Sequence, residues 1–228
     1  MKTPSDKIIF IDIETVPLSP TLNEMPERLR GIWIELELKK RAKDEKREEL
    51  PDYGFEDAAF RAEFSKIVCI SVGRYDGAVT DEAFKTTSFA SDNECEDLTN
   101  LSKVLIKYPS HILCAHNGKG FDYPFLARRY LINGLPLPKP LEIAGKKPWE
   151  IPLLDTKELW GFGARGPNDS PSLALLCAVF DVPTPKDDIS GADVKRVYYE
   201  EKNLPRIARY CEKDVQALAA VYKKLAQR

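Results

Sequence analysis

Apolar runs and amphipathic stretches alternate along the chain, and their periods predict both strands and helices. Residues 7–13 (KIIFIDI) alternate weakly and are rich in Ile and Phe, which predicts a mostly buried strand. By the same criteria, further strands are predicted at residues 66–73, 79–86, 111–116 and 153–156. Helices are predicted at residues 92–108, at 204–227, and directly after the 111–116 strand. This mixture of elements predicts an α/β fold.

A charged segment separates the first strand from the second. Residues 22–50 are dense in Glu, Lys and Arg but carry an apolar stripe that includes Trp33, which predicts a long charged helix. Pro51 and Asp52 would end it, and a shorter helix is predicted at residues 56–64. The chain therefore has a helical insertion at about residues 20–64. Two interpretations are open: a connection packed on the domain, or a lid or docking helix for a protein partner.

Composition limits the class of protein. A chain of 228 residues with 43% hydrophobic content can bury one α/β core, so residues 1–228 are expected to form a single domain. No apolar run approaches the roughly 20 residues that span a membrane, and the N-terminus lacks a signal-peptide pattern. Five cysteines without CxxC spacing indicate reduced thiols and a cytoplasmic location.

Candidate chemistry lies at three places far apart in sequence. Asp12 and Glu14 share one strand face near the end of the first strand. Asp122 falls in the first helical turn after the 111–116 strand, where α/β sheets form ligand crevices. Tyr210 and Asp214 share a face of the C-terminal helix. Convergence of four carboxylates indicates hard divalent cations, and a pair of Mg²⁺ or Mn²⁺ ions serves phosphodiester hydrolysis. This set predicts a metal-dependent nuclease.

Singly, the motifs carry little information. The sequence 92–94 (DNE) repeats the acidic spacing of the first motif, but Ser91 and Glu94 there have the pattern of a helix capping box. Tyr53 and Asp57 repeat the third spacing in a charged stretch. The middle motif, Asn-x-x-x-Phe-Asp at a strand-to-helix turn, is rarer. The prediction therefore depends on all three motifs occurring in order on suitable elements.

Together the motifs DIE, NGKGFD and YCEKD, within about residues 7–226, resemble the DEDD superfamily of 3′–5′ exonucleases. The chain is similar to the proofreading exonuclease domain of family B DNA polymerases and its stand-alone relatives. It resembles the tyrosine branch, DEDDy, because the position that the histidine branch would require as His is Arg209. The resemblance implies a ribonuclease H-like fold, with a central mixed β-sheet flanked by α-helices. It implies Tyr210 as the residue that orients the attacking water, and as metal ligands Asp12, Glu14, Asp122 and Asp214.

The expected reaction is removal of nucleoside monophosphates from the 3′ end of nucleic acid by two divalent cations. The resemblance favours single-stranded or frayed DNA, and RNA stays open as a substrate. Two alternatives are also open. One is a catalytically silent nucleic-acid-binding or scaffold domain, and the other is a metal-dependent phosphoesterase acting on small nucleotides. A basic groove leading to the acids would favour the polymer, whereas a closed pocket would favour the small molecule.

Substrate contacts are harder to place, because the net charge of −2 gives no broadly basic surface. Basic side chains near the second motif and in the following loops can contact phosphates, and aromatic side chains can stack on bases. The candidate substrate-binding residues are Asn117, Lys119, Phe121, Arg128 and Arg165.

Overall fold

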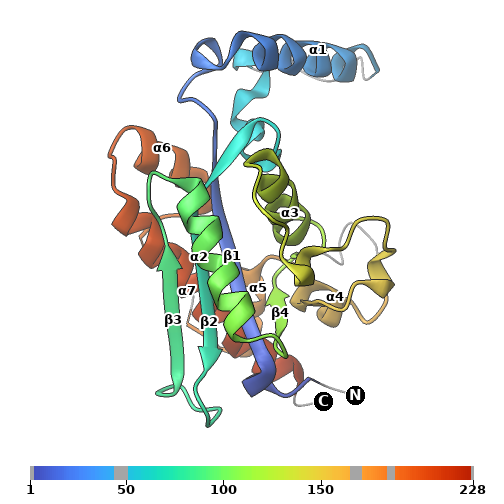
Figure 1. Cartoon of the computed structure of the whole chain (residues 1–228), viewed down its shortest axis with the longest axis vertical. Helices are drawn as coiled ribbons and strands as arrows, with labels where there is room; N and C mark the ends of the chain where they lie inside the picture. Colours follow the sequence, from blue (N-terminus) through green and yellow to red (C-terminus); the bar gives the residue numbers. More distant parts are fainter. Residues whose placement is uncertain (1–2, 44–50, 165–170, 184–187, 227–228) are drawn as a thin grey trace.

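The structure is a computed structural model that describes residues 3–43, 51–164, 171–183 and 188–226. Within these residues a five-stranded sheet has the order β3-β2-β1-β4-β5 (Figure 1). The strands are β1 (Ile8–Pro17), β2 (Ser65–Tyr75), β3 (Phe84–Phe89), β4 (Ile112–Ala115) and β5 (Leu154–Asp155). β2 is antiparallel to β1 and β3, whereas β4 is parallel to β1 and β5. The predicted α/β fold with a central mixed sheet is confirmed.

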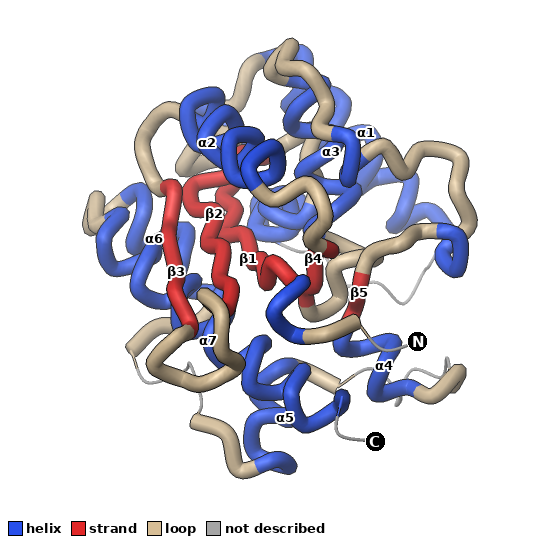
Figure 2. Tube along the Cα trace, turned by 60° about the horizontal axis from the view of Figure 1, so that its bottom comes forward, coloured by secondary structure: helices blue, strands red, loops and turns tan. Residues whose placement is uncertain are grey.

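Helices cover both faces of this sheet (Figure 2). They are α1 (Glu27–Lys43), α2 (Glu94–Lys107), α3 (Asp122–Ile132), α4 (Thr156–Gly161), α5 (Leu173–Phe180), α6 (Val194–Tyr199) and α7 (Leu204–Ala226). Alternation along β1 decides which helix each side chain meets. Ile9 and Ile11 share a core cluster with α2 and α3, whereas Ile8 and Phe10 share one with α7. Because strand side chains alternate between faces, Asp12 continues the series that faces α7.

The insertion between β1 and β2 is helical, as predicted, but its boundaries differ from the prediction. α1 begins at Glu27, and Leu22–Glu24 forms a separate 3₁₀ turn. The reason is Pro26, since a residue before proline is disfavoured in the α region and Met25 is extended here. Residues 44–50 of the predicted helix lie outside the described residues. The shorter helix expected at 56–64 is instead the 3₁₀ segment Pro51–Phe60.

α1 packs on this 3₁₀ segment at one end of the molecule (Figure 1). Trp33 is fully buried, with ring centroids 6.2 Å from Phe55 and 5.1 Å from Phe64. α1 therefore packs within the insertion itself, and both interpretations of the 22–50 segment, a connection packed on the domain and a docking helix for a partner, stay predictions.

The loop that connects β2 to β3 is longer than the sequence indicates. A strand was expected at residues 79–86, but β3 starts at Phe84. Asp76 N–H donates to the Ala83 carbonyl at 2.9 Å, and Ala83 N–H donates to the Thr80 carbonyl at 3.2 Å. These turns occupy the first half of the predicted strand. The residues that pair with β2 are therefore Phe84–Phe89, which lie further along the chain than predicted.

A buried ion pair joins α2 to α3. The Arg129 guanidinium donates to both carboxylate oxygens of Glu94, at 2.8 and 2.6 Å, and to the Ala62 carbonyl at 2.7 Å. The two side chains are only 5% and 9% exposed. Glu94 therefore does not form the expected capping box with Ser91. The N-cap of α2 is Asn93, whose side chain accepts from Glu96 N–H.

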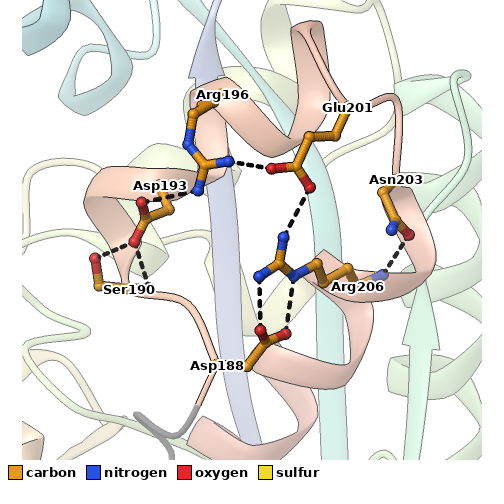
Figure 3. A network of polar contacts seen from close by, with 7 residues as sticks. All are labelled: Asp188, Ser190, Asp193, Arg196, Glu201, Asn203 and Arg206. Carbon is orange, nitrogen blue, oxygen red and sulfur yellow. Dashed lines mark hydrogen bonds and ion pairs between the residues drawn. The ribbon is translucent and has the colours of Figure 1, made fainter.

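Polar contacts fix the start of α7 (Figure 3). Asn203 caps the helix by accepting from Arg206 N–H at 3.2 Å. The Arg206 guanidinium donates to Asp188 at 2.6 and 2.9 Å and to Glu201 at 2.7 Å. Arg196 also pairs with Glu201, which links α6 to the same network. These contacts fix the N-terminal end of α7, the helix that carries the third motif.

In the part of the chain that the structure describes, no helix has the length and apolar character needed to cross a membrane.

Candidate active site

The three sequence motifs meet at one hollow of about 230 Å³. β1 contributes two acids, the first residue of α3 a third, and α7 a fourth with the phenol. The motif side chains that line it are Asp12, Glu14, Asp122, Tyr210 and Asp214. Other residues of its wall are Ile13, His116, Phe121, Ser172, Leu173 and Ala174. The structure thus brings together all five residues predicted to be catalytic.

Asp12 and Glu14 owe their common direction to their i, i+2 spacing on β1. Asp12 is half-buried and Glu14 is 8% exposed. A cysteine of α7 lies against them: the Cys211 thiol donates to Asp12 Oδ2 at 3.4 Å and to the Asp12 carbonyl at 3.5 Å. Ligand atoms of Asp12, Glu14 and Cys211 all lie within 4.8 Å of one another. Burial raises the pKa of the Cys211 thiol, so it remains protonated and donates to the acid.

Asp122 is placed by the turn between β4 and α3. Asp155 accepts from the backbone N–H groups of Asn117 and Lys119 at 2.9 and 3.0 Å, which fixes the turn. Gly118 is required there, because a Cβ atom would stand 2.6 Å from the Ala115 Cβ. Asp122 itself is 3% exposed, and the backbone of Ile13 on β1 lowers its pKa against the larger effect of burial.

Tyr210 and Asp214 lie one turn apart on α7, both buried. The pKa of the Tyr210 phenol is raised far above its usual value, first by burial and then by the charges of Asp214, Glu14 and Asp12. Its hydrogen bond to Asp214 acts in the same direction. The phenol is therefore neutral and can orient a ligand, but it cannot serve as a base near neutral pH.

Burial and mutual repulsion dominate the electrostatics of the hollow. Burial, then the charge of Asp214, raises the pKa values of Asp12 and Glu14 well above the ordinary range. The wall residues given above include no Lys or Arg. His116 does not compensate, because burial lowers its pKa and its ring is hydrogen-bonded to Thr156 and the Pro171 carbonyl. Clustered carboxylate oxygens of this kind fit a hard divalent cation.

This arrangement predicts a pH-dependent stability for the metal-free protein. Burial raises the pKa of Asp122 from 3.8 to about 7. Between these values the folded state holds a proton that the unfolded state releases, so the contribution of Asp122 to stability falls as pH rises through this window. Asp122→Asn removes the ionisation, and in EDTA we expect its melting temperature to exceed that of wild type by about 5 °C at pH 8.

The difference should shrink steadily as the pH falls from 8 and should vanish only below about pH 3.8, where Asp122 is protonated in both the folded and the unfolded state. Differential scanning calorimetry between pH 8 and pH 4 measures it. A difference that is constant with pH would contradict the prediction.

The predicted substrate-binding residues lie in different settings. Phe121 lines the hollow. Asn117 has a left-handed φ of 65° and accepts from Lys157 Nζ at 3.3 Å, so it shapes the turn, while Lys119 Nζ pairs with Glu158 at 2.7 Å. Arg128 is exposed on α3, outside the set of residues that line the hollow. Arg165 lies outside the described residues. Substrate contact by any of them stays a prediction.

Three parts of the site were not predicted from sequence. Cys211 sits inside the third motif, but a cysteine in an amphipathic helix has no pattern that separates it from ordinary core. The first turn of α5 (Ser172, Leu173, Ala174) reaches the hollow from a segment without any motif. His116, which also lines the hollow, ends the apolar run just before the second motif. This position next to the motif is the one feature of the sequence that could have indicated its role in the wall.

Known proteins resemble the chain in sequence and in fold. Residues 58–227 match a family described as a predicted 3′–5′ exonuclease related to the exonuclease domain of PolB. A family B DNA polymerase from the hyperthermophilic archaeon Pyrobaculum calidifontis has a similar fold, with a TM-score of 0.55 and 15% sequence identity. The similarity covers 97% of this chain and 25% of the polymerase chain, so this protein spans about a quarter of the length of that enzyme. No curated protein matches the sequence.

The family match begins after the first motif. Asp122, Tyr210 and Asp214 lie within the matched residues, whereas Asp12 and Glu14 precede them. The grouping of the first motif with the other two therefore comes from the structure rather than from the family match.

Proposed function

The chain belongs to the family of predicted 3′–5′ exonucleases related to the exonuclease domain of PolB, and from this premise we propose that it hydrolyses the 3′-terminal phosphodiester bonds of nucleic acid with two divalent cations. One observation carries the proposal: four carboxylates and a neutral phenol, from three elements far apart in sequence, line the same hollow. A binding or scaffold domain has no need of four clustered acids that repel one another.

We assign Asp12, Glu14, Asp122 and Asp214 as the residues that hold the cations. Their hard oxygen atoms suit Mg²⁺ or Mn²⁺, and release of mutual repulsion adds to the affinity. When bound, such ions activate water and neutralise charge on the phosphate. The Cys211 thiol restrains the Asp12 carboxylate through its hydrogen bond to Oδ2.

Tyr210 positions the attacking water in this proposal. Its raised pKa keeps the phenol protonated, so it holds the water by a hydrogen bond and does not take the proton. Asp214 lies one helical turn away from Tyr210, and its charge helps to keep the phenol protonated. The products are a nucleoside monophosphate and a nucleic acid one residue shorter. Single-stranded DNA is the favoured substrate, because the fold resembles that of a DNA polymerase.

The test of the proposal is a cleavage time course on single-stranded DNA and RNA, labelled at the 5′ end in one series and at the 3′ end in another. Reactions contain Mg²⁺, Mn²⁺ or EDTA. Stepwise shortening of the 5′-labelled strand, with immediate release of labelled mononucleotide from the 3′-labelled one, is expected only with metal. Cleavage from the 5′ end, or equal rates in EDTA, would overturn the proposal. Hydrolysis of mononucleotide esters without polymer cleavage would instead favour the small-nucleotide phosphoesterase.

Tyr210→Phe isolates the water-positioning role. We expect the single-turnover rate to fall about 10- to 100-fold, because the water loses its hydrogen bond while the acids remain in place. The affinity for Mn²⁺, measured by isothermal titration calorimetry, should change less than about twofold, since removing one hydroxyl takes away no carboxylate ligand. Tyr222→Phe, the same change on the same helix with a hydroxyl that bonds the Thr3 carbonyl, is the matched control. Loss of Mn²⁺ binding in the Tyr210 variant would contradict the assigned role.

A further inference from the structure

The helical insertion places an exposed aromatic ring against Phe121, one of the residues that line the acid-lined hollow. Phe60, the last residue of the 3₁₀ segment Pro51–Phe60, is 68% exposed. Its ring centroid lies 6.2 Å from that of Phe121, with the ring planes at 65°. Phe121 lines the hollow and is itself 5.1 Å from the buried Phe125. A row of three rings thus runs from the buried Phe125, through Phe121 in the wall of the hollow, to the exposed Phe60.

Hydrogen bonds hold the backbone on both sides of Phe60. The Thr15 hydroxyl, one residue after Glu14, donates to the Ala59 carbonyl at 2.7 Å. Arg129 on α3 donates to the Ala62 carbonyl at 2.7 Å, and Arg61 N–H donates to the Ala58 carbonyl at 3.0 Å. In Figure 1 the segment after α1 lies beside α3. The exposure of Phe60 is therefore not that of a loose loop, because the backbone around the ring is fixed to the strand and helix that carry the acids.

Exposing a large apolar ring in this way brings no stability to the fold. Phe55 and Phe64, on either side in sequence, are 3% and 4% exposed and complete the cluster around Trp33, which does not need Phe60. A fixed, exposed aromatic face next to a site for nucleic acid matches the way that single strands are bound, since every base offers a π-face for stacking.

We propose that Phe60 stacks on a nucleobase next to the scissile phosphate and, with Phe121, forms an aromatic platform that positions the strand end at the acids. The inference rests on the proposed function, because it takes a nucleic acid strand as the substrate. It gives the insertion a role in substrate binding that the four acids and Tyr210 do not supply. It also predicts tolerance for base identity, because stacking makes no use of base-edge hydrogen bonds.

The stacking can be measured without turnover. Oligonucleotides carry 2-aminopurine at one of the last three 3′ positions, and Ca²⁺ replaces the catalytic ions. Wild type is expected to alter the fluorescence at one of these positions. Phe60→Ala should lose that change and raise the Kd about 5- to 100-fold. Phe60→Tyr, which keeps a ring, should restore both, whereas Phe60→Leu, which keeps only apolar bulk, should not. Trp149→Ala removes another exposed aromatic that does not line the hollow and should behave as wild type.

The steady-state experiment adds a second readout. On strands with normal bases, Phe60→Ala should raise KM with a smaller effect on kcat, and this penalty should vanish when an abasic residue occupies the responsive position. An unchanged Kd and fluorescence for Phe60→Ala would overturn the stacking role even if wild type degrades DNA. Base-dependent, Phe60-dependent binding without any hydrolysis would keep the stacking role and reject the nuclease. Failure of wild type to bind any strand would reject both.

Discussion

Asp12→Asn is expected to lower the rate of 3′-end hydrolysis about a thousandfold or more, because it replaces one of the proposed metal ligands with a neutral amide. The substitution preserves shape, and the amide oxygen can still accept the hydrogen bond from the Cys211 thiol. The loss is therefore expected in the chemistry and in metal affinity, with the fold retained. Single-turnover kinetics with Mn²⁺ measure it.

The same variant should be more stable than wild type in EDTA. Burial and the charges of Asp214, Glu14 and Asp122 raise the pKa of Asp12, so at pH 8 its ionised form opposes folding. Addition of Mn²⁺ should raise the melting temperature of wild type and have a smaller effect on the variant. Asp97→Asn, at a buried acid of α2 that binds Ser91, is the control and should retain activity. Wild-type rates in Asp12→Asn would refute the assigned site.

Arg129→Met should have the largest effect on stability, about 3–5 kcal/mol of unfolding free energy. The substitution keeps the aliphatic length but leaves Glu94 buried without its cation, and the Ala62 carbonyl loses a donor. Urea denaturation followed by tryptophan fluorescence measures the change. The matched control is Arg128→Met, the same substitution one position earlier on α3, where the side chain is exposed and the change should stay within about 0.5 kcal/mol.

A double variant tests the cause. Adding Glu94→Gln to Arg129→Met removes the unpaired charge, so we expect part of the lost stability to return. Equal destabilisation by Arg128→Met and Arg129→Met, or no recovery in the double variant, would show that the pair is not what joins α2 to α3.

Much of the fold followed from local patterns. The buried strand that carries Asp12 and the amphipathic helix that carries Asp214 both formed at the predicted places, although β1 continues to Pro17, four residues past its predicted end. Element boundaries that depend on turns and prolines were harder to predict. Because of Pro26, α1 begins only at Glu27, and because of the turns at residues 76–83, β3 begins only at Phe84. The capping box expected at Ser91 failed because Glu94 has a stronger partner, Arg129, from a helix about 35 residues away in sequence.

By itself, the sequence determined the chemical groups of the site and the direction that each pair shares, since periods of 2 and 3.6 residues are fixed by the backbone. It did not determine which face of β1 the pair Asp12 and Glu14 would take. Tertiary structure decided that by packing α7 on the face of Ile8 and Phe10, and it also brought in Cys211 and Phe60. These neighbours depend on contacts between elements far apart in the chain, which no local spacing encodes.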